Sequence, residues 1–266
     1  MSKRWQPTLL IRASIALHVI ALIVLIAASA LWPWILIAII TNHIVITVMG
    51  LWPRSDLLGP NLTRLPAAAT ARNEIALTID DGPDPSVTPQ VLAILDEYSV
   101  KATFFCIANK AVQHPELCQE IIHRGHTIEN HSMHHRHNFS LLGYSGIKNE
   151  LQAAQDTLTN ITGQRPLFFR APAGLRNIFL DPVLSLLDLR LATWSVRGFD
   201  TQVGDAQRVN SKLLAGLHAG AILLLHDGNA ALTPQGTAVI LDVLPVLLAT
   251  AKENDLHFVT LQQAIS

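Results

Sequence analysis

The chain has 266 residues, of which half are hydrophobic and only 15% are charged, and its formal net charge is −1 with His neutral. So small a net charge gives no bulk electrostatic attraction for nucleic acid, and we expect no nucleic-acid partner. The apolar residues are concentrated near the start, because residues 13–51 contain no Lys, Arg, Asp or Glu. The remainder, about 195 residues, is enough for one globular domain.

Two apolar segments, 13–31 and 35–51, are each long enough for a membrane-spanning helix, which needs about 20 residues with a range near 17–25. Pro33 separates them, and the tryptophans on either side of it suit a membrane–water interface. We therefore predict a helical hairpin with a tight turn at Pro33. The alternative is that only one segment spans, since Asn42 and His43 make insertion of the second less favourable.

Residues 1–52 are thus predicted to be a membrane anchor, and basic residues lie outside both of its apolar segments. By the positive-inside rule both flanks of the hairpin lie in the cytoplasm. The rest of the chain is then at the cytoplasmic face of the membrane, whereas a single span would place it outside. The flanking basic residues are Lys3, Arg4, Arg12, Arg54, Arg64 and Arg72.

Residues 53–72 are rich in proline without a clear period and are predicted to be a linker, followed by one domain over 73–266. In this domain about seven strand-like runs alternate with helix-like runs, which predicts an α/β fold with a parallel sheet and right-handed crossovers. The expected strands are 74–79, 102–107, 127–130, 167–169, 191–196, 221–225 and 258–261. The expected helices are 88–98, 115–124, 144–162, 182–187, 205–217 and 238–254.

Five polar motifs each follow one of the expected strands. They are Asp80-Asp81-Gly82-Pro83, His131-Ser132-Met133-His134-His135, Arg170-Ala171-Pro172-Ala173-Gly174, Arg197–Asp200 and His226-Asp227-Gly228. The C-terminal ends of strands in an α/β barrel converge on one mouth, where acids, bases and metal ligands can meet. The order of the motifs therefore indicates an enzyme.

The first two motifs have the residue types of a catalytic metal site. Asp80 and Asp81 end an extended segment in which neighbouring side chains point opposite ways, so one can bind a metal while the other acts as a base. His131 and His135 are four residues apart, which on a helical turn puts both rings on one face. Two imidazoles and a carboxylate are a common zinc set that leaves a position for water. For the histidine pair of the metal site, His134 and His137 stay open as alternatives.

The remaining motifs provide a cation and a second acid–base group. Arg170 can hold a carboxylate through two hydrogen bonds. His226 ends an apolar strand and can act as a general acid, with Asp227 or Asp200 accepting its other ring proton.

These motifs resemble the polysaccharide deacetylase family, also called the NodB-homology or carbohydrate esterase 4 family, over roughly residues 73–265. The matching runs are Thr78–Pro83, His131–His135, Arg170–Gly174 and Leu223–His226. The resemblance implies a distorted seven-stranded (β/α) barrel, here preceded by the N-terminal transmembrane helices.

The resemblance also implies roles for individual residues. Asp80 would be the general base and His226 the general acid. A divalent metal, usually Zn²⁺, would be bound by Asp81, His131 and His135. Arg170 would tether the general base, and Asp200 falls at an acidic position of the fourth motif.

Three departures from the family pattern concern the substrate rather than the reaction: Leu175 replaces an aromatic residue, and Arg197 and Thr201 replace an Asp and a Trp. The expected reaction is metal-dependent hydrolysis of an N-acyl group, in particular N-acetyl, from an amino sugar. The membrane segments favour a glycolipid or lipid-linked sugar as substrate. The alternatives are a cell-wall or exopolysaccharide chain on the outer face, and an inactive metal-binding membrane module.

Overall fold

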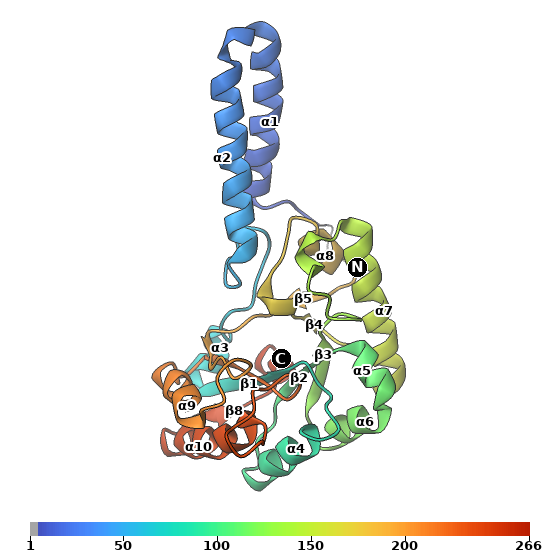
Figure 1. The fold of residues 1–266 in the computed structure, drawn as a ribbon, viewed down its shortest axis with the longest axis vertical. Coiled ribbons are helices and arrows are strands. Elements are labelled where there is room, and N and C mark those ends of the chain that lie inside the picture. The colour runs from blue at the N-terminus through green and yellow to red at the C-terminus, as the bar shows by residue number, and fades with distance from the viewer. Residues whose placement is uncertain (1–4) are drawn as a thin grey trace.

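The computed structural model describes residues 5–266, in which a helical hairpin projects from an α/β domain (Figure 1). The helices are α1 (Leu9–Ala27), α2 (Trp32–Leu51), α3 (Ala67–Ala71), α4 (Thr88–Glu97), α5 (Ala108–Gln113), α6 (Pro115–His123), α7 (Tyr144–Thr162), α8 (Leu180–Leu186), α9 (Ala206–Ala215), α10 (Val239–Glu253) and α11 (Leu261–Ala264). The 3-10 turns are η1 (Ser29–Leu31), η2 (Phe139–Leu141) and η3 (Pro172–Gly174). The strands are β1 (Glu74–Asp80), β2 (Thr103–Cys106), β3 (Thr127–Asn130), β4 (Phe168–Phe169), β5 (Arg190–Leu191), β6 (Val196–Arg197), β7 (Ile222–His226) and β8 (His257–Phe258).

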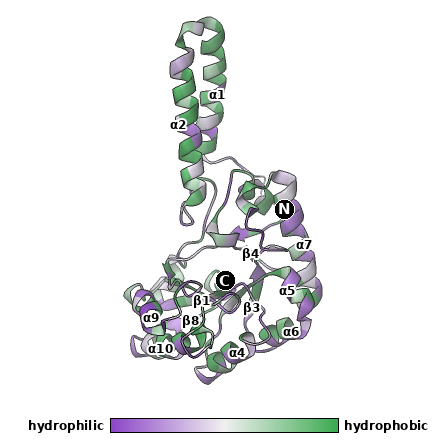
Figure 2. Cartoon of the chain, viewed as in Figure 1, coloured by the Kyte–Doolittle hydropathy of each residue, from purple (hydrophilic) through white to green (hydrophobic). Residues whose placement is uncertain are grey.

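Most of the hairpin consists of hydrophobic residues (Figure 2), and both of its helices are long and apolar enough to cross a membrane. The turn lies at Ala28–Leu31 and not at Pro33, where we predicted it. Pro33 instead stands in the first turn of α2, where a residue without an N–H group leaves no hydrogen bond unmade. Asn42 donates a hydrogen bond of 2.9 Å to the Ser14 hydroxyl across the hairpin, so its amide has a partner inside the pair.

Seven parallel strands form one curled sheet in the described chain, in the order β5-β4-β3-β2-β1-β7-β6, and β8 pairs with the start of β1. Helices lie around the outside of the strands (Figure 1). This confirms the predicted distorted seven-stranded α/β barrel. The expected strand 191–196 is wrong as a single element, because β5 and β6 lie at opposite edges of the sheet. Between them, the carbonyls of Ala192 and Thr193 accept hydrogen bonds from the Arg170 guanidinium, which turns this part of the chain towards the barrel interior.

The segment 53–72, predicted to be a linker, packs against the domain over much of its length. It contains α3, in which Ala69 is fully buried, and Leu65 is buried beside it. The backbone of Leu62 donates to the Leu191 carbonyl at 2.9 Å and forms an isolated parallel bridge to Ala192. The approach of the chain from the hairpin to β1 is therefore fixed by the domain.

The base of the hairpin contacts the loop that follows β4. The backbone N–H of Arg176 donates to the Gly50 carbonyl at 3.0 Å. The buried Arg176 guanidinium donates to the carbonyls of Ser55 and Gly59. The last turn of α2 thus lies against the segment that carries the third sequence motif.

Candidate functional site

The strand register brings the motif residues to one end of the sheet. Asp80 at the end of β1 pairs with His226 at the end of β7. On the other side, Asn130 at the end of β3 pairs with Phe169 of β4, so the residues that follow them are neighbours. All seven predicted residues are at this mouth and all are mostly or fully buried: Asp80, Asp81, His131, His135, Arg170, Asp200 and His226.

Three of these residues form a compact cluster of potential metal ligands. The Oδ1 atom of Asp81 lies 3.2 Å from Nε2 of His131 and 3.3 Å from Nε2 of His135. The three ligand atoms lie within 4.8 Å of one another. His134 instead pairs with Glu150 through its Nδ1 at 2.9 Å, and the triad is Asp81 with His131 and His135.

The predicted helical turn at this motif is wrong, although the predicted pair of rings does meet. Residues 131–135 form a loop, in which Ser132 and His135 have positive φ angles of 66° and 49°. The Asn130 side chain accepts a hydrogen bond from the Ser132 N–H, and the Ser132 hydroxyl accepts one from the His135 N–H. These two local bonds stabilise the loop that aims both imidazoles at Asp81.

The chemistry of this cluster fits a cation. The Nδ1 atom of His131 lies 2.8 Å from the Arg170 carbonyl, which can only accept, so Nδ1 carries the proton and Nε2 presents a lone pair. The Oδ1 atom of Asp81 is buried and accepts no hydrogen bond from the described residues. This oxygen faces the Nε2 lone pair of His131, an arrangement that a bound cation stabilises.

A second carboxylate is held beside the cluster by a fully buried arginine. Nη1 of Arg170 donates to Oδ1 of Asp80 at 2.7 Å and to the Thr78 hydroxyl at 2.8 Å. Burial lowers the pKa of Arg170, and the charge of Asp80 opposes this shift. Oδ2 of Asp80 lies 3.9 Å from Nε2 of His131, next to the cluster. The expectation that Asp80 and Asp81 point opposite ways is not met, because Asp81 has a φ of 73° and turns its carboxylate to the same mouth.

On the other side of Asp80, a buried acid–imidazole pair occupies the end of β7. Asp200 Oδ1 accepts from Nδ1 of His226 at 2.9 Å, and Asp200 Oδ2 accepts from the His226 backbone N–H at 2.7 Å. Burial lowers the pKa of His226, but Asp200, together with the charges of Asp80 and Asp81, outweighs burial and raises that pKa above its ordinary value. Of the two acids considered for this role, Asp227 instead binds the Thr88 hydroxyl at 2.5 Å, and burial raises its pKa to about 6.

Sequence reasoning missed two polar residues that support the site. Asn229 donates to Oδ2 of Asp81 at 3.1 Å, and Asn130 positions the loop that carries the histidines. Asn130 directly precedes the histidine motif, and Asn229 directly follows His226-Asp227-Gly228. Adjacency to a motif was the available indication in both cases.

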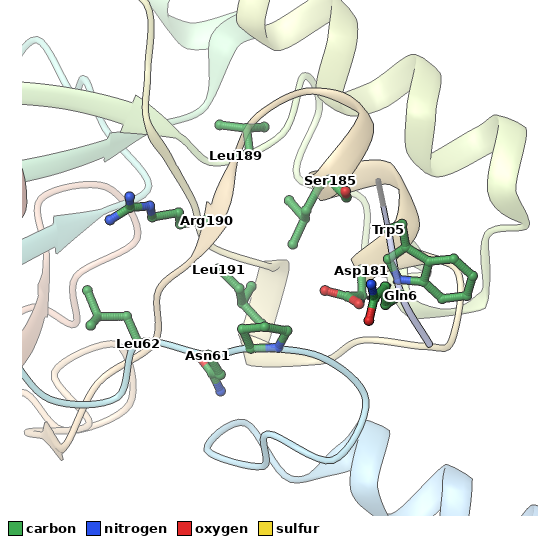
Figure 3. Close-up of a pocket in the computed structure, with 11 residues that line it drawn as sticks. Trp5, Gln6, Asn61, Leu62, Asp181, Ser185, Leu189, Arg190 and Leu191 are labelled. Carbon is green, nitrogen blue, oxygen red and sulfur yellow. Dashed lines mark hydrogen bonds between the residues drawn. The ribbon is translucent and has the colours of Figure 1, made fainter. Parts of the chain in front are cut away.

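A pocket of about 870 Å³ lies outside this mouth (Figure 3). It lies between α8, the start of β5 and the segments on either side of the hairpin, and its lining includes Trp5, Asn61, Asp181 and Arg190. The indole N–H of Trp5 donates to Asp181 at 2.7 Å. None of the seven predicted residues lines this pocket.

Comparison with known proteins identifies the class. The profile of a family described as polysaccharide deacetylase matches residues 67–192. The peptidoglycan-N-acetylglucosamine deacetylase PgdA of Listeria monocytogenes is 33% identical over 206 residues, 77% of this chain and 42% of the relative. A chitooligosaccharide deacetylase of Azorhizobium caulinodans is 35% identical over 165 residues, 61% of this chain and 78% of the relative. The chain belongs to the polysaccharide deacetylase family.

Solved structures have the same fold. The Bc1960 peptidoglycan N-acetylglucosamine deacetylase matches with a TM-score of 0.69 and 26% identity, over 77% of this chain and 92% of the other. A CE4 family pseudoenzyme from Bacillus anthracis matches with a TM-score of 0.69 and 20% identity, over 77% and 69% of the two chains, which shows the fold alone. The chain spans less than half the length of the Listeria relative.

Proposed function

We propose that this protein hydrolyses the N-acyl group, in particular N-acetyl, of an amino sugar in a metal-dependent reaction. The observation that carries the proposal is the pairing of Asp80 with His226 in strand register, next to the cluster of Asp81, His131 and His135. A base and an acid on neighbouring strands can act on one amide bond from two sides. The names of the relatives, which act on N-acetylglucosamine in peptidoglycan and on chitooligosaccharides, support the same class of substrate.

Asp81, His131 and His135 would hold the metal, and two imidazoles with one carboxylate suit Zn²⁺. When bound, the metal supplies a water of lowered pKa and polarises the amide carbonyl. The protein's own part is to keep the ligands oriented. Nδ1 of His131 is fixed by the Arg170 carbonyl, and Asn229 holds the second oxygen of Asp81.

Asp80 is the proposed general base. Arg170 occupies its Oδ1, so Oδ2 is the oxygen that takes the proton as water attacks the carbonyl carbon. Because Arg170 is buried and makes four hydrogen bonds, the carboxylate is held in one orientation before substrate binds.

His226 is the proposed general acid. Its Nδ1 proton is engaged by Asp200, so Nε2 is the atom that gives its proton to the departing amine. Asp200 is a positioning residue that keeps this tautomer and raises the pKa of the imidazole, which favours the protonated, acid form.

The test compares turnover with metal content for single variants of the full chain in detergent. Asp80→Asn and His226→Ala should each lose about 10²–10⁴-fold in kcat while the metal is retained. Asp81→Ala should lose the metal on elemental analysis. His134→Ala and His218→Ala, which change histidines outside the cluster, are the matched controls and should keep both metal and turnover. Full activity in Asp80→Asn would remove Asp80 from its role, and a wild-type protein that binds metal but hydrolyses no N-acetyl sugar would favour the inactive module.

We also propose that the hairpin spans the cytoplasmic membrane, with the catalytic domain on the cytoplasmic face and a glycolipid or lipid-linked amino sugar as substrate. Two observations support a hairpin with both ends on the domain side. Thr8, just before α1, donates to the Leu57 carbonyl at 2.7 Å, and Arg176 binds the base of α2. A reporter fused after Ser266 tests this. Activity on the cytoplasmic side would support the proposal, whereas activity outside would favour a cell-wall or exported polysaccharide, consistent with the substrates named for the relatives.

A further inference from the structure

A second arginine, Arg197, lies on the same face of the sheet as the site. Arg197 ends β6 and pairs in register with Leu224, which pairs with Thr78 of β1. Partners at one register in neighbouring strands point to the same face of a sheet. The Thr78 hydroxyl accepts from Arg170 inside the barrel, so Arg197 also begins on the interior face.

Aromatic rings surround this guanidinium, and it lacks a partner for one buried donor. Its Cζ lies 5.4 Å from the ring of Trp194 and 5.1 Å from that of Phe199. The same Trp194 ring lies 5.9 Å from Cζ of Arg170, so both guanidinium groups lie near one indole. Nε of Arg197 is buried and makes no hydrogen bond within residues 5–266. A buried donor without an acceptor is unfavourable, and a ligand oxygen at this position would remove the penalty.

Two more cations lie along the same strip, residues 194–199. Arg54 donates to the Ser195 carbonyl at 3.2 Å, and Nζ of Lys212 lies 4.4 Å from the Phe199 ring. Neither of these contacts supplies a negative charge. Arg54 follows the end of α2 by three residues, so the strip runs from the hairpin base to the mouth.

We propose that the 194–199 strip is a subsite for a phosphate group of the substrate, so that the preferred substrate is an amino sugar joined through phosphate to a lipid. The inference rests on the proposed deacetylase function and specifies its substrate. A guanidinium presents Nε and Nη donors as a fork that matches two phosphate oxygens. A lipid-linked phosphate lies at the membrane surface, next to Arg54, while the N-acyl group reaches Asp80.

The experiment measures equilibrium binding to the full chain in detergent by calorimetry, with N-acetylglucosamine 1-phosphate and N-acetylglucosamine as the two probes. The wild type should bind the phosphate-bearing sugar at least about tenfold more tightly, the ratio that one charge-assisted pair provides. Arg197→Gln should abolish this preference, and Arg197→Lys should retain part of it because it keeps the charge without the fork. Arg208→Gln, an exposed arginine on α9, is the matched control and should keep the preference. Equal binding of the two sugars by the wild type, or a preference that survives in Arg197→Gln, would overturn the inference.

Two further probes distinguish the sources of phosphate. A lipid-linked N-acetylglucosamine phosphate in nanodiscs should bind more tightly than the soluble sugar phosphate, again through Arg197. Anionic vesicles without sugar that displace the sugar phosphate with equal strength would make the strip a headgroup site and overturn its role in substrate recognition. Binding ratios are measured independently of turnover. The proposed deacetylase function, in which hydrolysis requires Asp80, can therefore be correct even where the phosphate preference is absent.

Discussion

The replacement of Asp200 by Asn tests the acid–imidazole pair without touching the proposed ligands. Asp200 is fully buried and accepts two hydrogen bonds from His226, one from the ring and one from the backbone. A hydrogen bond to a charged group contributes about 1.5–3 kcal/mol. Since each 1.36 kcal/mol is a factor of ten in rate, Asp200→Asn should lower kcat by about 10- to 150-fold.

The pH profile separates this role from a purely structural one. Asp200 raises the pKa of His226, so its loss lowers that pKa. A general acid works only when protonated, and activity is therefore lost as pH rises through its pKa. The alkaline limb of kcat against pH should move to lower pH in Asp200→Asn, with metal content unchanged. Asp205→Asn is the matched control, because Asp205 is an exposed N-cap of α9 and Asn caps equally well. An alkaline limb that stays in place would refute the reasoning, whatever happens to kcat.

Two further predictions concern stability of the full chain in detergent. A Cβ at Gly50 would meet the Arg176 carbonyl oxygen, so Gly50→Ser should destabilise the protein by ~1–3 kcal/mol and lower its melting temperature by roughly 2–12 °C. Gly143→Ser adds its Cβ in open space and should leave the melting temperature unchanged. Equal melting temperatures for the two variants would contradict the close contact at Gly50. His126 is buried, accepts from the Ala102 N–H, and burial lowers its pKa from 6.5 to about 4, so its contribution is complete above pH 6.5 and is lost as pH falls towards 4. At about 1.4 kcal/mol per pH unit, protonation of His126 should lower the free energy of unfolding by about 3 kcal/mol between pH 7 and pH 4. His126→Gln keeps an acceptor but cannot be protonated, so this part of the decrease should be absent from the variant. Identical pH dependence of the free energy of unfolding in the wild type and the variant would contradict the prediction.

The gathering of the candidate site residues at one mouth could be predicted because each ends a strand or follows one. Parallel strands share a direction, so residues that directly follow their ends converge whatever the details of the crossovers. Asp80 and His226 needed only the strand assignment, and they are partners in register. The helix 144–162 was also predictable, since its apolar period is regular and Gly163 adopts the left-handed conformation that ends it.

Local conformation within the motifs was not predictable from spacing. A separation of four residues fits a helical turn, but at His131 and His135 it is produced by a loop with two positive φ angles, stabilised by the side chains of Asn130 and Ser132. The strand break near Ala192 depends on carbonyls that bind an arginine more than twenty residues earlier in the chain. Both features depend on partners that a periodic pattern does not specify.

The contact between the hairpin and the third motif is the other feature that the sequence could not reveal, and it links the hairpin to the proposed base. Arg170 begins this motif and holds Asp80 from within the barrel, while Arg176, six residues later, holds the carbonyls at the base of α2. The short segment between them contains Gly174, which has a φ of 73° and where a Cβ would meet the Trp194 ring and Pro53. The hairpin base is therefore connected through a few residues of chain to the arginine that holds the proposed base. On the proposed membrane placement, this short connection keeps the mouth near the bilayer, which suits a substrate that is held at that surface and does not diffuse to the site from solution.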